Sequence, residues 1–186
     1  MLRENEVSAE FNVSRTPVRE AFQRLSIGGL VEIRNGIGTF VTQFEPDRID
    51  AVFQLRSEMA SLIGRMNTRS ATQDDIRTLE TLLERAQRLN ENFDVREHWR
   101  INHELHFVVS SFVRNPVFIE IWNNLYFQAA RTWYDVSTEI WGDAVRLLCA
   151  EITELLTAAG ENDREAIGSI RRNYIKYYHA RIVNKI

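Results

Sequence analysis

The stretch that decides the fold runs from Val13 to Leu25, VSRTPVREAFQRL. Ser14 or Thr16 suits the start of a helix, where a side-chain oxygen accepts from free backbone N–H groups, and Pro17 suits the first turn. Apolar residues then recur at helical spacing and predict an inward stripe of Val18, Ala21, Phe22 and Leu25. The outer side is polar and consists of Arg15, Thr16, Arg19 and Gln23. The stretch therefore predicts an amphipathic helix with two arginines near its start.

The flanking segments extend this helix into a larger motif. Upstream, residues 4–11 predict a short helix with Val7 and Phe11 inward, and Asn12 suits a tight turn. Downstream, Asn35-Gly36 separates two β-prone runs, which is the strongest short-range signal for a hairpin. Helix, turn, helix and hairpin in this order predict a winged helix-turn-helix.

Four runs in this region carry a family resemblance: LRENEV (2–7), VSRTPVREA (13–21), GLV (29–31) and GIGTFV (36–41). They resemble the GntR family of bacterial transcription regulators. The resemblance implies that Arg15, Thr16 and Arg19 contact DNA and that the wing glycine, Gly36, approaches the minor groove. Arginine suits this role because its fork pairs with guanine O6 and N7. Gln23 on the outer face and Asn35 in the hairpin turn complete the set of residues that we expect to bind DNA.

The predicted organisation has three parts. Residues 1–43 form the winged helix, 44–48 form a linker that contains Pro46, and 49–186 form a helical domain for effector binding and dimerisation. The first helix of the family, which precedes the motif, has no counterpart here. The winged helix is therefore expected to be truncated at its N-terminus.

Composition favours a soluble cytoplasmic protein. The single cysteine, Cys149, excludes an intramolecular disulfide and fits a reducing compartment. No apolar run is long enough for a membrane span, and no signal peptide is present. The net charge is −3, and residues 1–43 hold five arginines against five glutamates. A DNA-binding domain without net charge must place its arginines on one face.

Beyond residue 48 the β signals end, and apolar residues recur at three- and four-residue spacing. Six helices are predicted, over 49–67, 73–90, 94–113, 115–137, 141–159 and 163–183. The inward stripe of the first includes Leu55 and Leu62. The fold class is therefore mainly α, a winged helix-turn-helix followed by an all-α six-helix antiparallel bundle. The run NHELHF (102–107) followed by Asn115-Pro116 resembles the FCD domain, and the helix count resembles its VanR-like branch.

The helix predicted over 94–113 carries most of the information about an effector site. His98, Asn102 and His106 recur every four residues and fall within its apolar face, while His103 lies at the flank. Buried polar side chains need partners, so three on one inward face predict a polar cavity for an organic effector. The alternative is that a neighbouring helix satisfies each of them. Other helices are expected to add Arg131, Tyr134 and Tyr174 to the effector site, with Arg131 pairing with a carboxylate.

The FCD resemblance also implies a metal, held by an Asp and a His four apart on this helix and by one His from each of the last two helices. Asn102 stands at the Asp position and His106 at the His position. Ile152 falls at the third ligand, and Asn173 or Tyr174 at the fourth. One imidazole and one amide suit a divalent ion poorly. A metal at Asn102 and His106 is thus the less favoured alternative, and no cofactor is expected. The resemblance implies effectors such as small carboxylates, sugar acids or acyl thioesters.

Three functions are compatible with these features. The leading hypothesis is a ligand-responsive regulator whose homodimer binds a pseudo-palindromic operator in double-stranded DNA. An enzyme that uses the histidines of the 94–113 helix as acid and base lacks a nucleophile–base motif, a carboxylate pair and a phosphate loop. The third hypothesis is a helical small-molecule or protein interaction module that has lost DNA binding. The arginines and threonine retained at the DNA-contacting positions argue against this third hypothesis.

Overall fold

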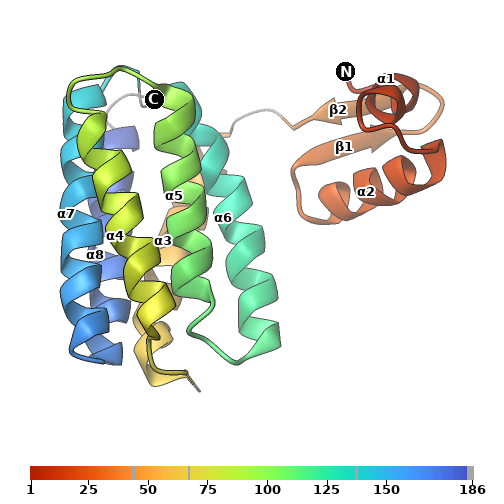
Figure 1. Cartoon of the computed structure of the whole chain (residues 1–186). Helices are drawn as coiled ribbons and strands as arrows, with labels where there is room; N and C mark the ends of the chain where they lie inside the picture. The colour runs from red at the N-terminus through yellow and green to blue at the C-terminus, as the bar shows by residue number, and fades with distance from the viewer. Residues whose placement is uncertain (43–44, 67, 137, 184–186) are drawn as a thin grey trace. The chain divides into compact units, whose positions relative to one another are not determined.

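The computed structural model describes residues 1–42, 45–66, 68–136 and 138–183, and of positions 46, 131, 133–136 and 183 it describes only the backbone. The chain divides into two compact units, the N-terminal unit (Met1–Glu45) and the bundle (Pro46–Ile186). Figure 1 shows the elements of both units. None of the helices in the described residues is long and apolar enough to cross a membrane.

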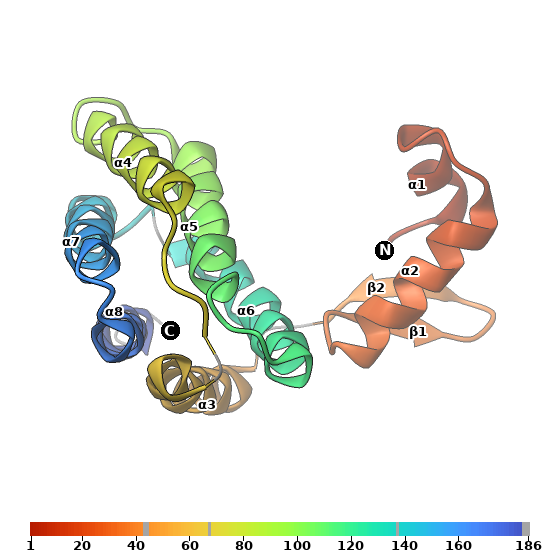
Figure 2. The same ribbon diagram turned by 60° about the horizontal axis from the view of Figure 1, so that its bottom comes forward.

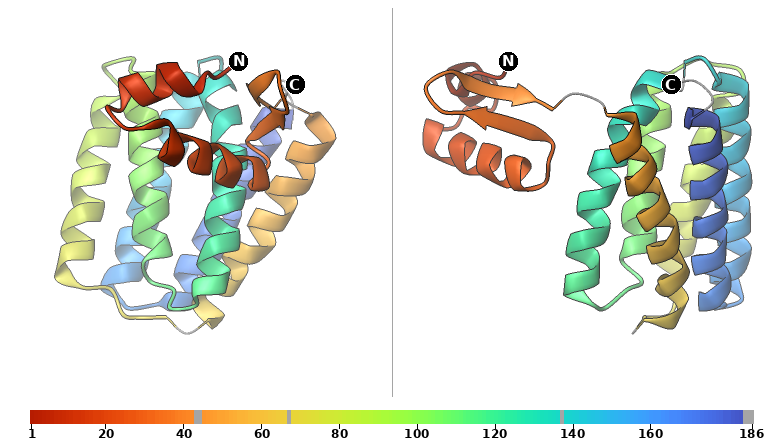
Figure 3. Two further views of the ribbon diagram at one scale, coloured as in Figure 1. Left: turned by 90° about the vertical axis from the view of Figure 1, so that its right-hand side faces the viewer. Right: turned by 180° about the vertical axis from the view of Figure 1, so that it is seen from behind.

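The N-terminal unit is a helix-turn-helix followed by a two-stranded hairpin. Its elements are α1 (Glu4–Glu10), α2 (Arg15–Ile27), β1 (Val31–Arg34) and β2 (Gly38–Val41). Asn12 adopts the left-handed conformation, with a φ of 51°, and so makes the turn between the helices. The strands are antiparallel and pair from Val31 opposite Val41 to Arg34 opposite Gly38. Figure 3 shows the hairpin alongside α2, and this arrangement confirms the predicted winged helix.

The hairpin turn depends on Gly36. The backbone N–H of Ile37 donates to the carbonyl oxygen of Arg34 at 3.0 Å, so Asn35 and Gly36 occupy the central positions of the turn. Gly36 has a φ of +76°, a conformation that glycine adopts without steric cost. The predicted Asn-Gly hairpin is therefore present, with the glycine at its tip.

A small apolar core joins α2 to the hairpin, formed by Val18, Phe22 and Val31. The prediction that Phe11, Ala21 and Leu25 also point inward was wrong. Phe11 is 69% exposed and Leu25 is 37% exposed, and Ala21 is exposed as well. The reason is that α2 presents only one narrow side to the hairpin. Nothing in the described part of the unit covers the flank of α2 that carries Ala21 and Leu25, or Phe11 at the end of α1.

The described part of the bundle holds six α-helices and one short 3-10 helix. They are α3 (Pro46–Leu62), η1 (Ile63–Arg65), α4 (Gln73–Arg88), α5 (Val95–Ser110), α6 (Pro116–Val136), α7 (Trp141–Gly160) and α8 (Arg164–Val183). Each helix packs mainly against two neighbours, so that α3, α6, α5, α4, α7 and α8 follow one another around a closed ring. Figure 2 shows this ring nearly end-on. The predicted six-helix bundle is confirmed. Its first helix begins at Pro46 rather than at residue 49, since proline suits the first turn.

The inward face of α3 differs from the prediction. Leu55 and Leu62 are 49% and 38% exposed, because α3 packs between α6 and α8 and leaves their flank at the surface. The other predicted inward residues of this helix, Ile49, Val52, Phe53 and Met59, are buried, as is Ile63 in η1. The buried stripe of α3 also includes Arg56, Ser57 and Ala60. The core therefore contains an arginine.

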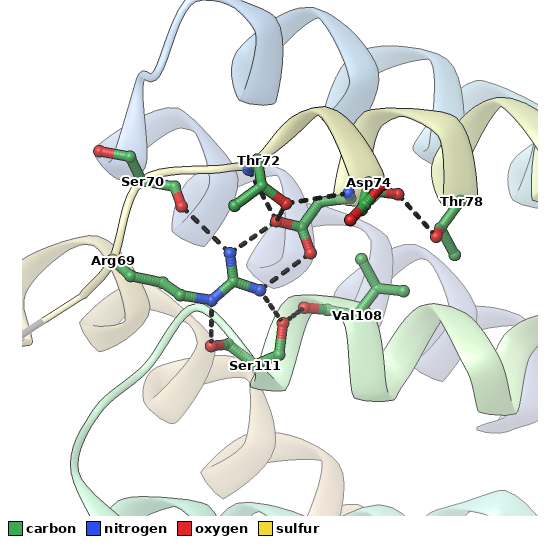
Figure 4. A network of polar contacts seen from close by, with 8 residues as sticks. Arg69, Ser70, Thr72, Asp74, Thr78, Val108 and Ser111 are labelled. Atoms are coloured by element: carbon green, nitrogen blue, oxygen red, sulfur yellow. Dashed lines mark hydrogen bonds and ion pairs between the residues drawn. The ribbon is translucent and has the colours of Figure 1, made fainter.

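Arg69 fixes the loop between η1 and α4 (Figure 4). Its guanidinium donates to both carboxylate oxygens of Asp75, at 2.6 and 2.8 Å. It also donates to the carbonyl oxygen and the hydroxyl oxygen of Ser111, at 3.0 and 2.6 Å. Asp75 and Thr72 form a capping box that satisfies backbone N–H groups at the start of α4. This network ties the loop and the start of α4 to the end of α5.

Candidate functional sites

The first candidate site is a groove on the N-terminal unit, which we call the wing groove. It has a volume of about 590 Å³ and lies between α1, the start of α2 and the hairpin turn. Five of the six predicted DNA-binding residues line it, namely Arg15, Arg19, Gln23, Asn35 and Gly36. The sixth, Thr16, is exposed but does not line the groove. The fold therefore gathers residues from two separate segments around one concave surface.

Arginines dominate the chemistry of the wing groove, although some are paired with acidic residues. The guanidinium of Arg19 donates from Nε and Nη2 to the two carboxylate oxygens of Glu4, at 3.0 and 2.9 Å. This hydrogen bonding lowers the pKa of Glu4 and raises the pKa of Arg19. Arg34 is paired with Glu32 at 2.9 Å and lies over the ring of Phe40. Exposed guanidiniums of this kind bind phosphates and base edges.

The second candidate site is a cavity inside the bundle, which we call the bundle cavity. Residues of α3, α5, α6 and α8 line it, namely Phe53, Arg56, His98, Trp99, Asn102, Tyr126, Ala130, Arg171, Ile175 and Tyr178. Its volume is about 30 Å³, room for about two water molecules. A larger ligand therefore requires some of these side chains to move.

The predicted effector residues fall into three groups. His98 and Asn102 line the bundle cavity. His106 is fully buried behind the lining, where its ring stacks on Tyr126 with centroids 3.8 Å apart. Tyr174 is buried outside the lining, because its hydroxyl donates to Glu154 at 2.6 Å. The side chains of Arg131 and Tyr134, both on α6, lie outside the described residues.

The two buried histidines of α5 are held neutral. Burial lowers the pKa of His98 to about 4, and it lowers the pKa of His106 well below its usual value. The Nε2 of His106 lies 2.8 Å from Oδ1 of Asn123 on α6, so this nitrogen carries the proton. Its Nδ1 is buried and has no hydrogen-bond partner among the described residues. A neighbouring helix therefore satisfies only one side of this imidazole.

Sequence reasoning missed three buried charged residues: Arg56 and Arg171, which line the bundle cavity, and Glu151 beside Arg171. Arg171 donates from Nη1 to Oε1 of Glu151, which forms a buried ion pair. Each of the three falls on the apolar stripe of its own helix. Arg56, for example, comes three residues after Phe53 and three before Met59. The sequence therefore did hold a signal for these residues, namely a charged side chain at a position where the periodicity predicts a buried apolar one.

Arg56 is buried among aromatic rings rather than against a carboxylate. Its guanidinium carbon lies 5.5 to 5.7 Å from the ring centres of Phe53, Trp122 and Tyr126. Its Nε has no hydrogen-bond partner among the described residues. Burial lowers the pKa of Arg56 to about 9, so the side chain remains a cation at neutral pH.

The residues present do not fit the metal that FCD domains imply. In the part of the chain that the structure describes, no three His, Cys, Asp or Glu side chains come together as metal ligands. The surroundings of His106 are instead cationic, since Arg56 and Arg171 add to the burial that lowers its pKa. Neighbouring guanidiniums repel a divalent cation and attract an anion.

Models of two protein families match the chain. "Bacterial regulatory proteins, gntR family" matches residues 1–41, and the FCD domain matches residues 51–176. The chain belongs to the GntR regulators that carry an FCD domain. The predicted family is therefore confirmed for both units of this GntR–FCD chain.

Known relatives of the GntR–FCD chain are regulators rather than enzymes. The probable D-xylose utilization operon transcriptional repressor of Paenarthrobacter nicotinovorans is 44% identical over 66 residues, 35% of the chain and 29% of that protein. The Uxu operon regulator of Haemophilus influenzae is 29% identical over 136 residues, 66% of the chain and 50% of that protein. The matches thus span half or less of these relatives. The solved structure of E. coli McbR/YncC shares the fold, with a TM-score of 0.84 at 18% identity over 99% of this chain and 87% of that one.

Proposed function

We propose that the GntR–FCD chain acts in the cytoplasm as part of a homodimeric transcription regulator, which binds an operator in double-stranded DNA and responds to a small organic effector. The observation that carries the proposal is the wing groove. It gathers Arg15, Arg19 and Gln23 from one helix with Asn35 and Gly36 from the hairpin turn. Regulators with a winged helix place the start of such a helix in the major groove.

The geometry supports a role for each part of the wing groove. Arg15 and Arg19 lie in the first turns of α2, where side chains reach base edges. A side-chain carbon built on Gly36 would have no atom within 4 Å, so the tip of the hairpin is open to a phosphate backbone. A homodimer would present two such grooves to a two-fold symmetric operator.

The bundle cavity is proposed as the effector site. It combines apolar walls with a few polar groups, the usual make-up of small-molecule sites. His98 and Asn102 line it, while roles for His106, Arg131, Tyr134 and Tyr174 stay predictions. The cations at the cavity support an effector that bears a carboxylate.

The first experiment is a selection from randomised duplex DNA with the full chain, followed by anisotropy titrations at one fixed salt concentration. We expect a two-fold symmetric site. We also expect Arg19→Ala to weaken binding by about 1–3 kcal/mol, roughly five- to hundredfold in Kd. Arg24→Ala is the matched control, because Arg24 is exposed on the same helix and does not line the wing groove.

The alternative is an interaction module that has lost DNA binding. A folded chain that enriches no sequence, or an Arg19→Ala variant with the affinity of the unchanged chain, would support that alternative. The mass of the chain in solution, measured by light scattering with and without the selected DNA, tests the homodimer separately.

A further inference from the structure

We propose that the bundle cavity is a metal-independent receptor for a small monoanionic carboxylate, and that Arg56 is the group that binds the carboxylate. This inference deepens the proposed function and rests on it for the role of the cavity as an effector site. In the family, a metal ion is expected to supply the positive charge in the bundle. Here the structure assigns that charge to a buried arginine.

The first observation is an unsatisfied buried cation. Arg56 is 4% exposed, lies in the lining of the cavity and has an Nε without a hydrogen-bond partner among the described residues. A buried charge is costly unless a partner of opposite charge compensates it. Three aromatic rings give it partial compensation, but no carboxylate forms an ion pair with it among the described residues. A carboxylate would supply two hydrogen-bond acceptors.

The second observation is the balance of charge around the cavity. Arg56 and Arg171 contribute two positive charges, and Glu151 is hydrogen-bonded to Arg171. Burial raises the pKa of Glu151, while the adjacent Arg171 favours its ionised form. With this pair ionised, one positive charge remains among the described side chains. Among the described side chains, the other titratable groups near Arg56 are uncharged at neutral pH. Burial lowers the pKa of His98 and of His106 and raises the pKa of Tyr126 to about 12. One negative charge balances the site, whereas a dianion would leave a second charge buried without a partner.

The third observation is the size and polarity of the walls. The rings of Phe53, Trp99 and Tyr126 and the aliphatic Ile175 and Ala130 surround the polar groups. The cavity is small, at about 30 Å³. A ligand with one carboxylate and a compact apolar body matches the polarity of these walls and enters once some of the lining side chains move. A polyhydroxylated or multiply charged ligand would bury polar groups without partners.

The test uses the full 186-residue chain with defined probes. Butanoate and benzoate are the monoanions, butanamide and benzamide are their uncharged analogues, and succinate and phthalate are the dianions. Binding is measured by calorimetry and by the rise in Tm, with and without excess EDTA. We expect both monoanions to bind and raise the Tm equally well in EDTA, and the amides and dianions to bind at least tenfold more weakly.

Variants at Arg56 provide the second half of the test. Arg56→Met keeps an unbranched apolar stem but removes the guanidinium and its charge, and it should lower the affinity for the monoanions at least tenfold. Its Tm without ligand should rise, because an uncompensated buried charge is replaced by an apolar side chain. Arg56→Lys, which keeps the charge but loses the fork, should bind with intermediate affinity. Arg100→Met is the control, since the side chain of Arg100 is 62% exposed and outside the cavity.

Four results would overturn the proposal: binding that disappears in EDTA, equal binding of the amides, unchanged affinity in Arg56→Met, or no binding of either monoanion. If Arg56→Met does not fold, Arg56→Lys and the amide comparison still decide the question. DNA binding measured on the same samples separates the two proposals. A chain that binds benzoate through Arg56 but selects no DNA would uphold the receptor and refute the regulator.

Discussion

Arg19 reaches the wing groove with its guanidinium already held by Glu4. A DNA phosphate or guanine must therefore compete with a carboxylate for the same fork. We predict that Glu4→Gln tightens binding to the selected duplex several-fold, because it frees Arg19 and removes a negative charge from the groove. Anisotropy titrations at fixed salt measure the effect. Glu20→Gln removes the same charge from an exposed position outside the groove, and an equal gain in that control would show that only net charge matters.

His98 makes the stability of the bundle depend on pH. Its pKa is about 4 in the folded chain, where it is buried beside Asn102 and hydrogen-bonded to the backbone of Ala144, against an ordinary value of 6.5. Between these values the unfolded chain binds a proton that the folded chain does not, so stability falls as the pH falls from 6.5 to 4. The loss from this residue is about 3 kcal/mol.

Urea unfolding at several pH values measures this dependence. His98→Gln should flatten the slope between pH 4 and 6.5, while His106 maintains part of it because its pKa is also lowered. An identical slope in the variant and the unchanged chain would contradict the assignment to His98.

At the level of the helices, the carboxylate of Asp75 stabilises the start of α4 through two interactions. Asp75 caps the helix with Thr72 and also binds both guanidinium nitrogens of Arg69 (Figure 4). We predict that Asp75→Asn lowers the free energy of unfolding by about 2–4 kcal/mol, because it weakens the cap and leaves a half-buried arginine unpaired. Asp74→Asn is the matched control: Asp74 is exposed and pairs with Arg77 at the surface, so its loss should cost less than about 1 kcal/mol.

Replacing a glycine by alanine should have opposite effects at two places in the bundle, in η1 where it contacts α8 and near the start of α7. A Cβ added at Gly64 would lie 2.4 Å from the carbonyl oxygen of Arg164, whereas one added at Gly142 would meet nothing within 4 Å. Gly64→Ala should therefore destabilise the bundle by about 1–3 kcal/mol. Gly142→Ala, near the start of α7, should stabilise it by up to about 1 kcal/mol. Denaturant unfolding of both variants checks the pair, and equal effects would contradict the close approach of the two elements.

For the whole molecule, the two proposed sites make a thermodynamic prediction that needs no knowledge of how the units are placed. If benzoate changes the Kd for DNA by some factor, saturating DNA must change the Kd for benzoate by the same factor. We expect a factor of about 5 to 150. Paired titrations of the full chain measure both factors, and Arg56→Met should reduce both to one. A factor of one in the unchanged chain would show that the bundle cavity does not regulate DNA binding.

Local sequence was enough to predict the winged helix, the six helices and the two sets of residues that line the wing groove. Arg15, Arg19 and Gln23 lie on one face of one helix, and Asn35 and Gly36 form one turn, so short-range geometry alone brings each set together. Local sequence was less reliable for which side of each helix is buried, since Phe11 and Leu55 were predicted to be buried and are exposed. Periodicity tells which residues share a side of a helix, but not which neighbour covers that side.

The bundle cavity was decided only by the tertiary structure. Arg56, Glu151 and Arg171 come from α3, α7 and α8, and they meet because the ring of helices closes between the first and last of the bundle. The sequence by itself determined that a winged helix is followed by a helical bundle, since both follow from local periodicity and turns. Its motifs carried the resemblance to the GntR family. The three-dimensional packing decided that the centre of the bundle is cationic, because the charge of a cavity depends on side chains that are far apart along the chain.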